Sequence, residues 1–167
     1  SKLHLVGLVS SGGVHSLEEH LYALLGLARE QQLGKVFVHM FTDGRDTHRK
    51  VALASLDRLA RKFLEYRLGQ IATVTGRFYA MDRGGHFEVT ESVYRALTEG
   101  AGRPVVSPRT AIESYYQSQI FDEVIPPTVI VDHNQQPVGR VEDGDAVIFF
   151  NFRSDRMRQL ATAFIDP

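Results

Sequence analysis

Arginine side chains follow three of the strands that this sequence predicts, close to the point where each strand ends. Arg45, Arg77 and Arg153 come within a few residues of apolar, β-branched runs, and the helix-to-strand connections carry nothing comparable. A guanidinium group matches carboxylate and phosphate oxygens with two parallel hydrogen bonds. Any one surface arginine more often pairs with a nearby aspartate, but a set along one sheet edge indicates an anion site. The predicted set comprises Arg45, Arg77, Arg83, Arg153 and Arg156.

A histidine stands in the first of these connections. His15 follows the paired glycines Gly12 and Gly13, which let the backbone approach a ligand closely. Its imidazole could donate a hydrogen bond to an anion or exchange a proton. The histidines within or beside predicted strands, such as His4 and His39, are interpreted instead as structural. We therefore include His15 among the predicted ligand contacts.

Asp46 is the candidate for proton transfer. It lies beside Arg45, and surrounding arginines would favour its ionised, proton-accepting form. The same carboxylate could instead order the loop as an Asx turn or cap a helix, and the residues alone leave both interpretations open. The preceding Asp43 and Gly44 are interpreted as a simple turn.

Strand and helix patterns alternate along the chain. Apolar, β-branched runs predict strands over residues 3–9, 35–41, 70–75, 128–131 and 145–150. Apolar stripes at helical period predict helices over residues 17–28, 53–64, 88–99, 108–117 and 157–165. This alternation predicts one α/β domain over residues 1–167, with a parallel or mixed sheet and helices on both faces, in three layers. The carboxyl ends of parallel strands meet at one edge, so the arginine-bearing loops should converge there.

Local signals predict where some helices begin and end. Ser16 and Glu19 have the spacing of a capping box, and Gly34 is the predicted stop of the first helix. Ser107 and Pro108 predict the start of a later helix, because the N–H that proline lacks is free in a first turn anyway.

The composition limits the classes of function. A formal charge of −1 and a pI near 6.6 argue against nucleic-acid and membrane partners, which usually require a surplus of Lys and Arg. The sequence has no cysteine, no apolar run of membrane-spanning length and no signal-peptide pattern, and we expect a cytoplasmic location. No histidine spacing supports a zinc site. The chain begins without methionine, which suggests a piece of a longer protein.

Four strand-end motifs, taken together, resemble the cofactor-independent (2,3-bisphosphoglycerate-independent) phosphoglycerate mutases. They occur in that family's order across nearly the whole chain, and no serine-hydrolase elbow, dinucleotide fingerprint or P-loop competes with them. The resemblance is to the inserted phosphotransferase domain, which in that family interrupts an alkaline-phosphatase-like domain. The motifs are Gly12–Ser16, Asp43–Asp46, Gly76–Arg83 and Phe149–Arg156.

The resemblance implies an activity and a division of labour. The family are isomerases of glycolysis and gluconeogenesis, which interconvert 3-phosphoglycerate and 2-phosphoglycerate through a phosphoserine. That serine and two metal ions, usually Mn²⁺, belong to the phosphatase-like domain, so this chain is expected to bind no metal and to be inactive alone. By the same resemblance Asp46 moves the glycerate hydroxyl proton. The implied substrate contacts are His15, Arg45, Asp46, Arg77, Arg83, Arg153 and Arg156.

The chain departs from the family pattern in two places. The family usually has aspartate where this chain has Ser11, and a basic residue followed by tryptophan where His86 and Phe87 stand. Replacement of the aspartate removes a charge near the predicted site. The alternative function is a stand-alone, non-catalytic module that binds a phosphorylated metabolite in the same pocket.

Overall fold

The computed structural model describes residues 1–165, which fold around one mixed β-sheet. The strand order is β4-β5-β3-β2-β1-β6. The strands β6, β1, β2 and β3 run parallel, β5 runs antiparallel to β3, and β4 runs parallel to β5. The strands are β1 (Leu3–Leu8), β2 (Val36–Thr42), β3 (Gln70–Gly76), β4 (Arg103–Val105), β5 (Thr128–Ile130) and β6 (Ala146–Phe149). Strand β4 has only three residues, one of them proline, and was not predicted.

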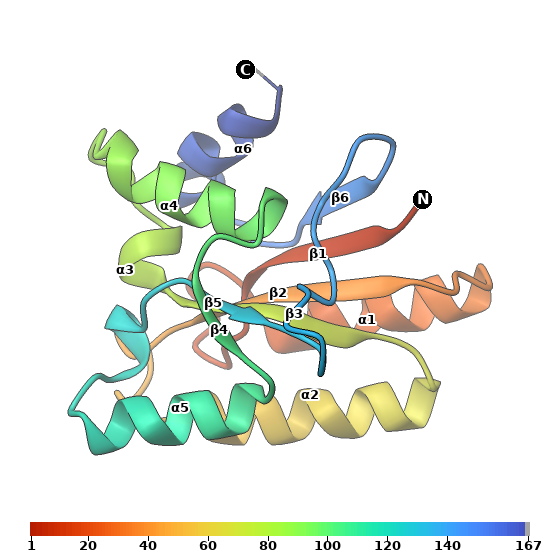
Figure 1. Cartoon of the computed structure of the whole chain (residues 1–167), viewed down its shortest axis with the longest axis horizontal. Coiled ribbons are helices and arrows are strands. Elements are labelled where there is room, and N and C mark those ends of the chain that lie inside the picture. The colour runs from red at the N-terminus through yellow and green to blue at the C-terminus, as the bar shows by residue number, and fades with distance from the viewer. Residues whose placement is uncertain (166–167) are drawn as a thin grey trace.

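Helices cover both faces of the sheet (Figure 1), which confirms the predicted α/β fold. Helices α1, α2 and α5 contribute to one buried apolar cluster, and α3, α4 and α6 to the other. Short 3₁₀ turns follow α5 and β6, at Asp122–Val124 and Ser154–Arg156. No helix within residues 1–165 has the length and apolar character of a membrane span. The helices are α1 (Glu18–Glu30), α2 (Ala52–Tyr66), α3 (Arg77–Ala80), α4 (Phe87–Thr98), α5 (Pro108–Gln117) and α6 (Arg158–Ile165).

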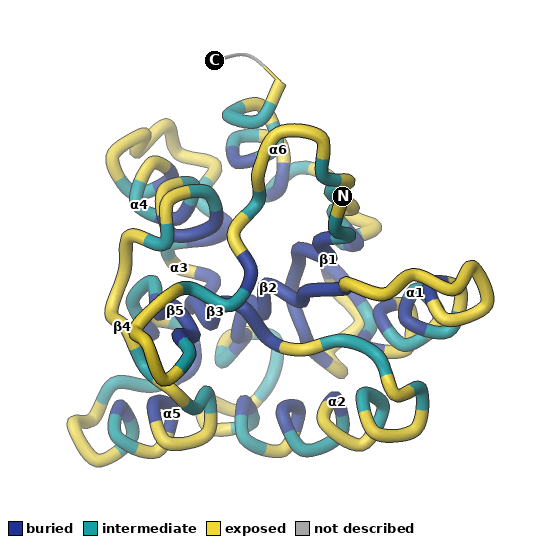
Figure 2. The backbone as a smooth tube through the Cα atoms, turned by 45° about the vertical axis from the view of Figure 1, so that its right-hand side comes forward, coloured by how far each residue is buried: buried dark blue, intermediate teal, exposed yellow. Residues whose placement is uncertain are grey.

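The central strands β1, β2 and β3 form the buried interior of the molecule (Figure 2). Alternate residues of β1 enter opposite apolar clusters: Leu5 packs with side chains of α1 and α2, whereas Val6 and Leu8 pack with side chains of α4 and α6. This is the period-two geometry of a strand. Burial of each of these side chains stabilises the fold by about 1.5–3 kcal/mol. The two apolar clusters therefore hold the central strands, and with them the carboxyl ends of those strands, in fixed positions.

The predicted capping box of the first helix is wrong. Leu17 occupies the N-cap position of α1, without a side-chain hydrogen bond. Ser16 is buried, and its Oγ donates instead to the carbonyl oxygen of Leu8, 2.5 Å away. The serine side chain thus links the helix entry to the end of β1, a tertiary contact that capping-box spacing cannot reveal.

The helix ends agree with the sequence only in part. Helix α1 ends at Glu30, four residues before the predicted stop at Gly34, because Gln32 takes the left-handed conformation with φ 57°. The predicted start of α5 is confirmed: Ser107 is its N-cap, and the Ser107 hydroxyl accepts the N–H of Thr110.

Helix α2 is capped from a distant part of the chain. Its own N-cap residue, Val51, makes no side-chain cap. Asp122 supplies the acceptor, since its Oδ2 lies 2.7 Å from the N of Val51 and 2.9 Å from the N of Ala52. The 3₁₀ turn that contains Asp122 is thereby held against the start of α2, close to the end of β2.

Candidate functional site

Four parallel strands end at one edge of the sheet, and the loops that follow them form the candidate site. β1 leads towards His15, β2 towards Asp46, β3 directly into Arg77 and β6 towards Arg153. Pairing of β1 with β2 and β6, and of β2 with β3, brings these strand ends side by side. The expected convergence of the loops therefore occurs in the folded chain.

Asp43, directly after β2, is the centre of a buried hydrogen-bond network. Its Oδ1 accepts the backbone N–H groups of Arg45 (3.1 Å) and Asp46 (2.9 Å), and its Oδ2 accepts the hydroxyl of Ser10 (2.5 Å). Burial raises the pKa of Asp43, but the hydrogen bonds from Ser10 and the loop backbone outweigh burial and lower it. The interpretation of Asp43 and Gly44 as a simple turn is incomplete, because the turn also holds a buried negative charge.

Arg77 crosses from β3 to this network. Its side chain is only 4% exposed, and its Nη1 lies 2.9 Å from Asp43 Oδ1 and 2.5 Å from Asp46 Oδ2. Burial lowers the pKa of Arg77, but hydrogen bonds to Asp46 and Asp43 raise it above its usual value. The Asx turn suggested for Asp46 is made by Asp43 instead, which leaves the Asp46 carboxylate to contact Arg77.

His15 lies between two carboxylates and is almost fully buried. Its Nε2 is 4.0 Å from Asp46 Oδ2, and its Nδ1 is 4.0 Å from Asp155 Oδ1. Burial, together with the nearby charge of Arg77, lowers the pKa of His15. The imidazole is therefore neutral near pH 7 and can accept a proton.

A cavity of about 490 Å³ opens beside the network, and three of the predicted arginines line it: Arg45, Arg77 and Arg156. Arg45 pairs with Glu123, 3.2 Å away. Arg156 donates to the carbonyl oxygen of Met81 (3.4 Å), and no carboxylate in residues 1–165 lies within 4 Å of its guanidinium. Burial and the charges of neighbouring arginines lower the pKa of Arg156. An anion bound here would relieve that repulsion.

The two remaining arginines meet at Asp155 and lie outside this cavity. Arg83 Nη1 is 2.8 Å from Asp155 Oδ2, and Arg153 Nε is 3.3 Å from Asp155 Oδ1. Arg83 and Asp155 also line an adjoining hollow of about 340 Å³. Arg156 lies in the 3₁₀ turn that precedes α6, not in the first turn of α6 itself. The predicted arginines thus form two neighbouring groups, and His15 lies between Asp46 of one and Asp155 of the other.

Glu123 lines the cavity and was not predicted. The segment around it packs against glycines at the ends of two strands: a Cβ at Gly44 would lie 2.8 Å from Glu123 N, and one at Gly76 would lie 2.4 Å from Glu123 O. Any larger residue at Gly76 would displace this backbone. In the sequence, Gly44 and Gly76 beside the ends of strands indicate that another backbone segment packs closely there. They do not identify which distant segment it is.

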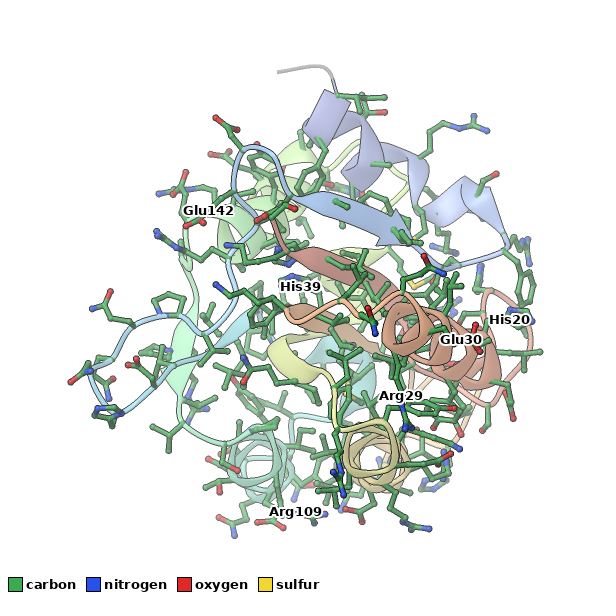
Figure 3. The ribbon with its side chains drawn as sticks, turned by 90° about the vertical axis from the view of Figure 1, so that its right-hand side faces the viewer. His20, Arg29, Glu30, His39, Arg109 and Glu142 are labelled. Carbon is green, nitrogen blue, oxygen red and sulfur yellow. The ribbon has the colours of Figure 1, made fainter. Side chains whose placement is uncertain are left out.

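The strand histidines belong to a different buried cluster, as predicted. His39 Nε2 lies 2.9 Å from His4 Nδ1, and His39 Nδ1 lies 3.0 Å from Thr73 Oγ1. His4 Nε2 is 3.3 Å from Asp145 Oδ2, which also pairs with Lys2. Figure 3 shows His39 within the sheet. Both imidazoles are fully buried, and each ring nitrogen has a partner.

The fold and the site define a wound α/β domain that presents an arginine-lined cavity at the carboxyl edge of its sheet. The family model described as the N-terminus of BPG-independent PGAM matches residues 1–167. The chain therefore belongs to the N-terminal domain family of the 2,3-bisphosphoglycerate-independent phosphoglycerate mutases, which confirms the resemblance seen in its motifs.

Relatives and a solved structure agree with this assignment. The chain is 53% identical over 167 residues to the 2,3-bisphosphoglycerate-independent phosphoglycerate mutase of Chloroflexus aggregans, covering 100% of this chain and 31% of that protein. It is 49% identical over 165 residues to the enzyme of the same name from Myxococcus xanthus, covering 99% and 32%. A crystal structure of Leishmania mexicana phosphoglycerate mutase at low cobalt concentration matches with a TM-score of 0.96 at 33% identity, covering 99% of this chain and 32% of that one.

The chain thus spans about a third of the length of these relatives. Each of them is a phosphoglycerate mutase by name, so a stand-alone module of another function is not favoured.

Proposed function

We propose that this chain is the substrate-holding part of a phosphoglycerate mutase that interconverts 3-phosphoglycerate and 2-phosphoglycerate in glycolysis and gluconeogenesis. The observation that carries the proposal is the cavity lined by Arg45, Arg77 and Arg156. Its volume suits a three-carbon acid phosphate, and its guanidinium groups suit the two anionic ends of that substrate. The names of the relatives supply the substrate class.

Within this proposal the arginines position the substrate and compensate its charge. Arg77 is held rigidly by Asp43, so it offers a fixed direction for binding. Within residues 1–165 Arg156 has no carboxylate to release before it binds an anion, whereas Arg45 must leave Glu123. Arg153 is half exposed and can turn towards a ligand. His15, Arg83 and Asp46 complete the proposed set.

Asp46 is the proposed group for moving the proton of the glycerate hydroxyl. Its Oδ2 contacts Arg77, and the same oxygen is 4.0 Å from His15 Nε2. A carboxylate held beside a substrate hydroxyl can accept its proton while the hydroxyl attacks phosphorus, and can return the proton afterwards.

We further propose that the remaining two thirds of the parent protein supply the nucleophilic serine and two Mn²⁺ ions, on a phosphatase-like domain, in the cytoplasm. Within residues 1–165 no group of three or more His, Asp or Glu side chains is arranged to hold a metal ion. Closure of that domain over the cavity would bring the phosphoserine to the glycerate and exclude water.

Calorimetry of 3-phosphoglycerate with the isolated chain tests the binding role. We expect weak binding that Arg156→Ala reduces strongly and that Arg109→Ala leaves unchanged. Arg109 is the matched control because it lies on the outer surface of α5 (Figure 3), where it pairs with Asp57 of α2. Equal affinity of the Arg156→Ala and Arg109→Ala variants would show that the site lies elsewhere.

A second assay tests whether the chain needs the rest of the parent protein for catalysis. The chain with 3-phosphoglycerate and Mn²⁺ should give no 2-phosphoglycerate, and addition of the separately produced remainder of a related mutase should restore turnover. Turnover by the chain alone would contradict the proposal.

A further inference from the structure

Two buried polar atoms beside the cavity face each other without a hydrogen bond. His15 Nδ1 and Asp155 Oδ1 are 4.0 Å apart, about 1 Å more than the length of an N–H···O hydrogen bond. Both are among the four buried side-chain atoms within residues 1–165 that make no hydrogen bond, although Arg153 Nε lies 3.3 Å from Asp155 Oδ1 as an ion pair outside hydrogen-bond geometry. Buried polar atoms in native proteins are usually paired. The two atoms therefore indicate an arrangement that a bound ligand completes.

We propose that Asp155 is a positioning residue, which accepts a hydrogen bond from Nδ1 of His15 when the anion is bound, so that Nε2 faces the substrate. The inference rests on the proposed function, because the anion is the phosphoglycerate of that proposal. Nε2 lies on the other side of the ring, 4.0 Å from Asp46 Oδ2. In a neutral imidazole one nitrogen donates and the other accepts. Fixing the proton at Nδ1 therefore leaves Nε2 free to accept a proton beside Asp46.

Arg153 explains why this hydrogen bond is absent without a ligand. Its Nε is 3.3 Å from Asp155 Oδ1, the oxygen that also faces His15, and its side chain is 52% exposed. An anion that binds Arg153 draws the guanidinium towards itself and releases Oδ1 to His15. The backbone N–H of Arg153 already donates to the carbonyl oxygen of His15 (3.3 Å). This hydrogen bond joins the loop of Arg153 to the loop of His15.

The charges around His15 favour the same change. Burial, then Arg77 and Arg153, lower the pKa of His15, while Asp46 and Asp155 oppose them. The negative charge of a bound anion would cancel the positive charges of Arg77 and Arg153 at His15. Asp46 and Asp155 would then dominate the electrostatics, and the pKa of His15 would rise. His15 can then take a second proton at Nε2 and donate it in a hydrogen bond to the anion.

Asp155 is suited to this role because it stays ionised. Burial raises its pKa, but the neighbouring Arg153, His15 and Arg83 outweigh burial and lower it. Its second oxygen is held by Arg83 at 2.8 Å. The carboxylate is therefore fixed through Oδ2, and Oδ1 remains the acceptor available to His15.

The ¹⁵N chemical shifts of the His15 ring nitrogens measure its tautomer directly, on the chain with and without saturating 3-phosphoglycerate. In the wild-type complex we expect a proton at Nδ1 whenever His15 is neutral, and a second proton at Nε2 as the pH falls. In Asp155→Asn we expect most of the neutral His15 to change to the Nε2–H form, its pKa to fall, and affinity for 3-phosphoglycerate to weaken about tenfold. Arg109→Ala is the matched control, because it removes an exposed ion pair that involves neither His15 nor Asp155.

The wild-type complex decides the question even if a variant fails to fold: neutral His15 protonated at Nε2 would overturn the proposal. Equal tautomer changes in Asp155→Asn and Arg109→Ala would also overturn it, since the change would then not come from loss of the Asp155 carboxylate. Failure of the proposed function is a separate result, seen as no binding of 3-phosphoglycerate. Concentrated sulfate then serves as the anionic probe, and the same tautomer measurement applies.

Discussion

Two buried polar clusters lie towards opposite ends of the same parallel strands, and they differ in how completely their atoms are paired. The amino-end cluster consists of Lys2, His4, His39, Thr73 and Asp145. The carboxyl-end cluster consists of His15, Asp43, Asp46, Arg77 and Asp155.

In the amino-end cluster every ring nitrogen of both histidines has a partner, and Asp145 accepts the N–H of Lys2 at 2.7 Å. In the carboxyl-end cluster two buried atoms, His15 Nδ1 and Asp155 Oδ1, make no hydrogen bond within the part of the chain that the structure describes. A closed network contributes to stability alone, because it has no capacity left for a ligand. An incompletely paired network beside a cavity costs stability, and a ligand can complete it.

Arg77 of the carboxyl-end cluster is both buried in ion pairs with Asp43 and Asp46 and part of the cavity lining, so its removal should have the largest effect. Arg77→Ala would leave Asp43 as a buried charge without its guanidinium, and we expect the free energy of unfolding to fall by about 3–5 kcal/mol. Denaturant titration measures this loss, and calorimetry should show no binding of 3-phosphoglycerate. A loss below about 1 kcal/mol would mean that the ion pairs of Arg77 are not structural.

The second-largest effect is expected from acid, which should lower the stability of the folded chain through the histidines of the amino-end cluster. Burial lowers the pKa of His4, and burial followed by the charge of His4 lowers that of His39 to about 3, from an unfolded value of 6.5. The unfolded chain therefore binds protons that the folded chain does not, and stability present above pH 6.5 is lost as pH falls towards 3. The expected loss from His39 is about 1.4 kcal/mol per pH unit.

Thermal unfolding between pH 7 and pH 4.5 measures this dependence. His39→Gln, which cannot take up a proton, should unfold at a lower temperature at pH 7 but show a shallower decrease with acid. A profile as steep as that of the wild type would assign the acid sensitivity to other groups.

Removal of Arg156 should separate binding from stability. Its guanidinium has a carbonyl oxygen as its hydrogen-bond partner in residues 1–165, so Arg156→Ala should change the free energy of unfolding by less than about 0.5 kcal/mol. Affinity for 3-phosphoglycerate should fall about 10- to 100-fold. Calorimetry and denaturant titration on the same variant measure both quantities, and a stability loss that matches the affinity loss would contradict this separation.

The smallest effect is expected for an ion pair that belongs to neither cluster. Arg109 contacts Asp57 and Glu113 at the surface, where solvent screens the charges. Arg109→Ala should change stability by less than about 0.5 kcal/mol and leave binding unaffected. A larger loss would show that an exposed ion pair of this chain can contribute as much to stability as the buried ones.

The fold was largely predictable because its signals are local. The apolar runs of β1, β2 and β3 and the helical stripes of α2 and α4 show their periodicity within each segment. Features that depend on contact between distant segments were missed. Ser16 was predicted as a helix cap but donates to Leu8 across the loop, and α2 is capped by Asp122, seventy residues further along the chain.

The candidate site was predictable in its charges but not in its pairing. The arginines could be found because strand ends share an edge in any parallel sheet. The sequence could not show that Asp43 accepts hydrogen bonds from four other residues, or that Glu123 lies against Arg45, since both depend on tertiary packing. The site roles of His15, Arg45, Asp46, Arg77, Arg83, Arg153 and Arg156 stay predictions until binding is measured.

The most direct test of the central claim is a map of backbone amide NMR shifts as 3-phosphoglycerate is added to the ¹⁵N-labelled chain. We expect the shifts to concentrate in the loops after β1, β2, β3 and β6, at residues 10–16, 43–46, 77–83 and 151–156, and to be absent around His4 and Asp145. Shifts centred on the amino-end cluster, or equal at both ends of the strands, would contradict it.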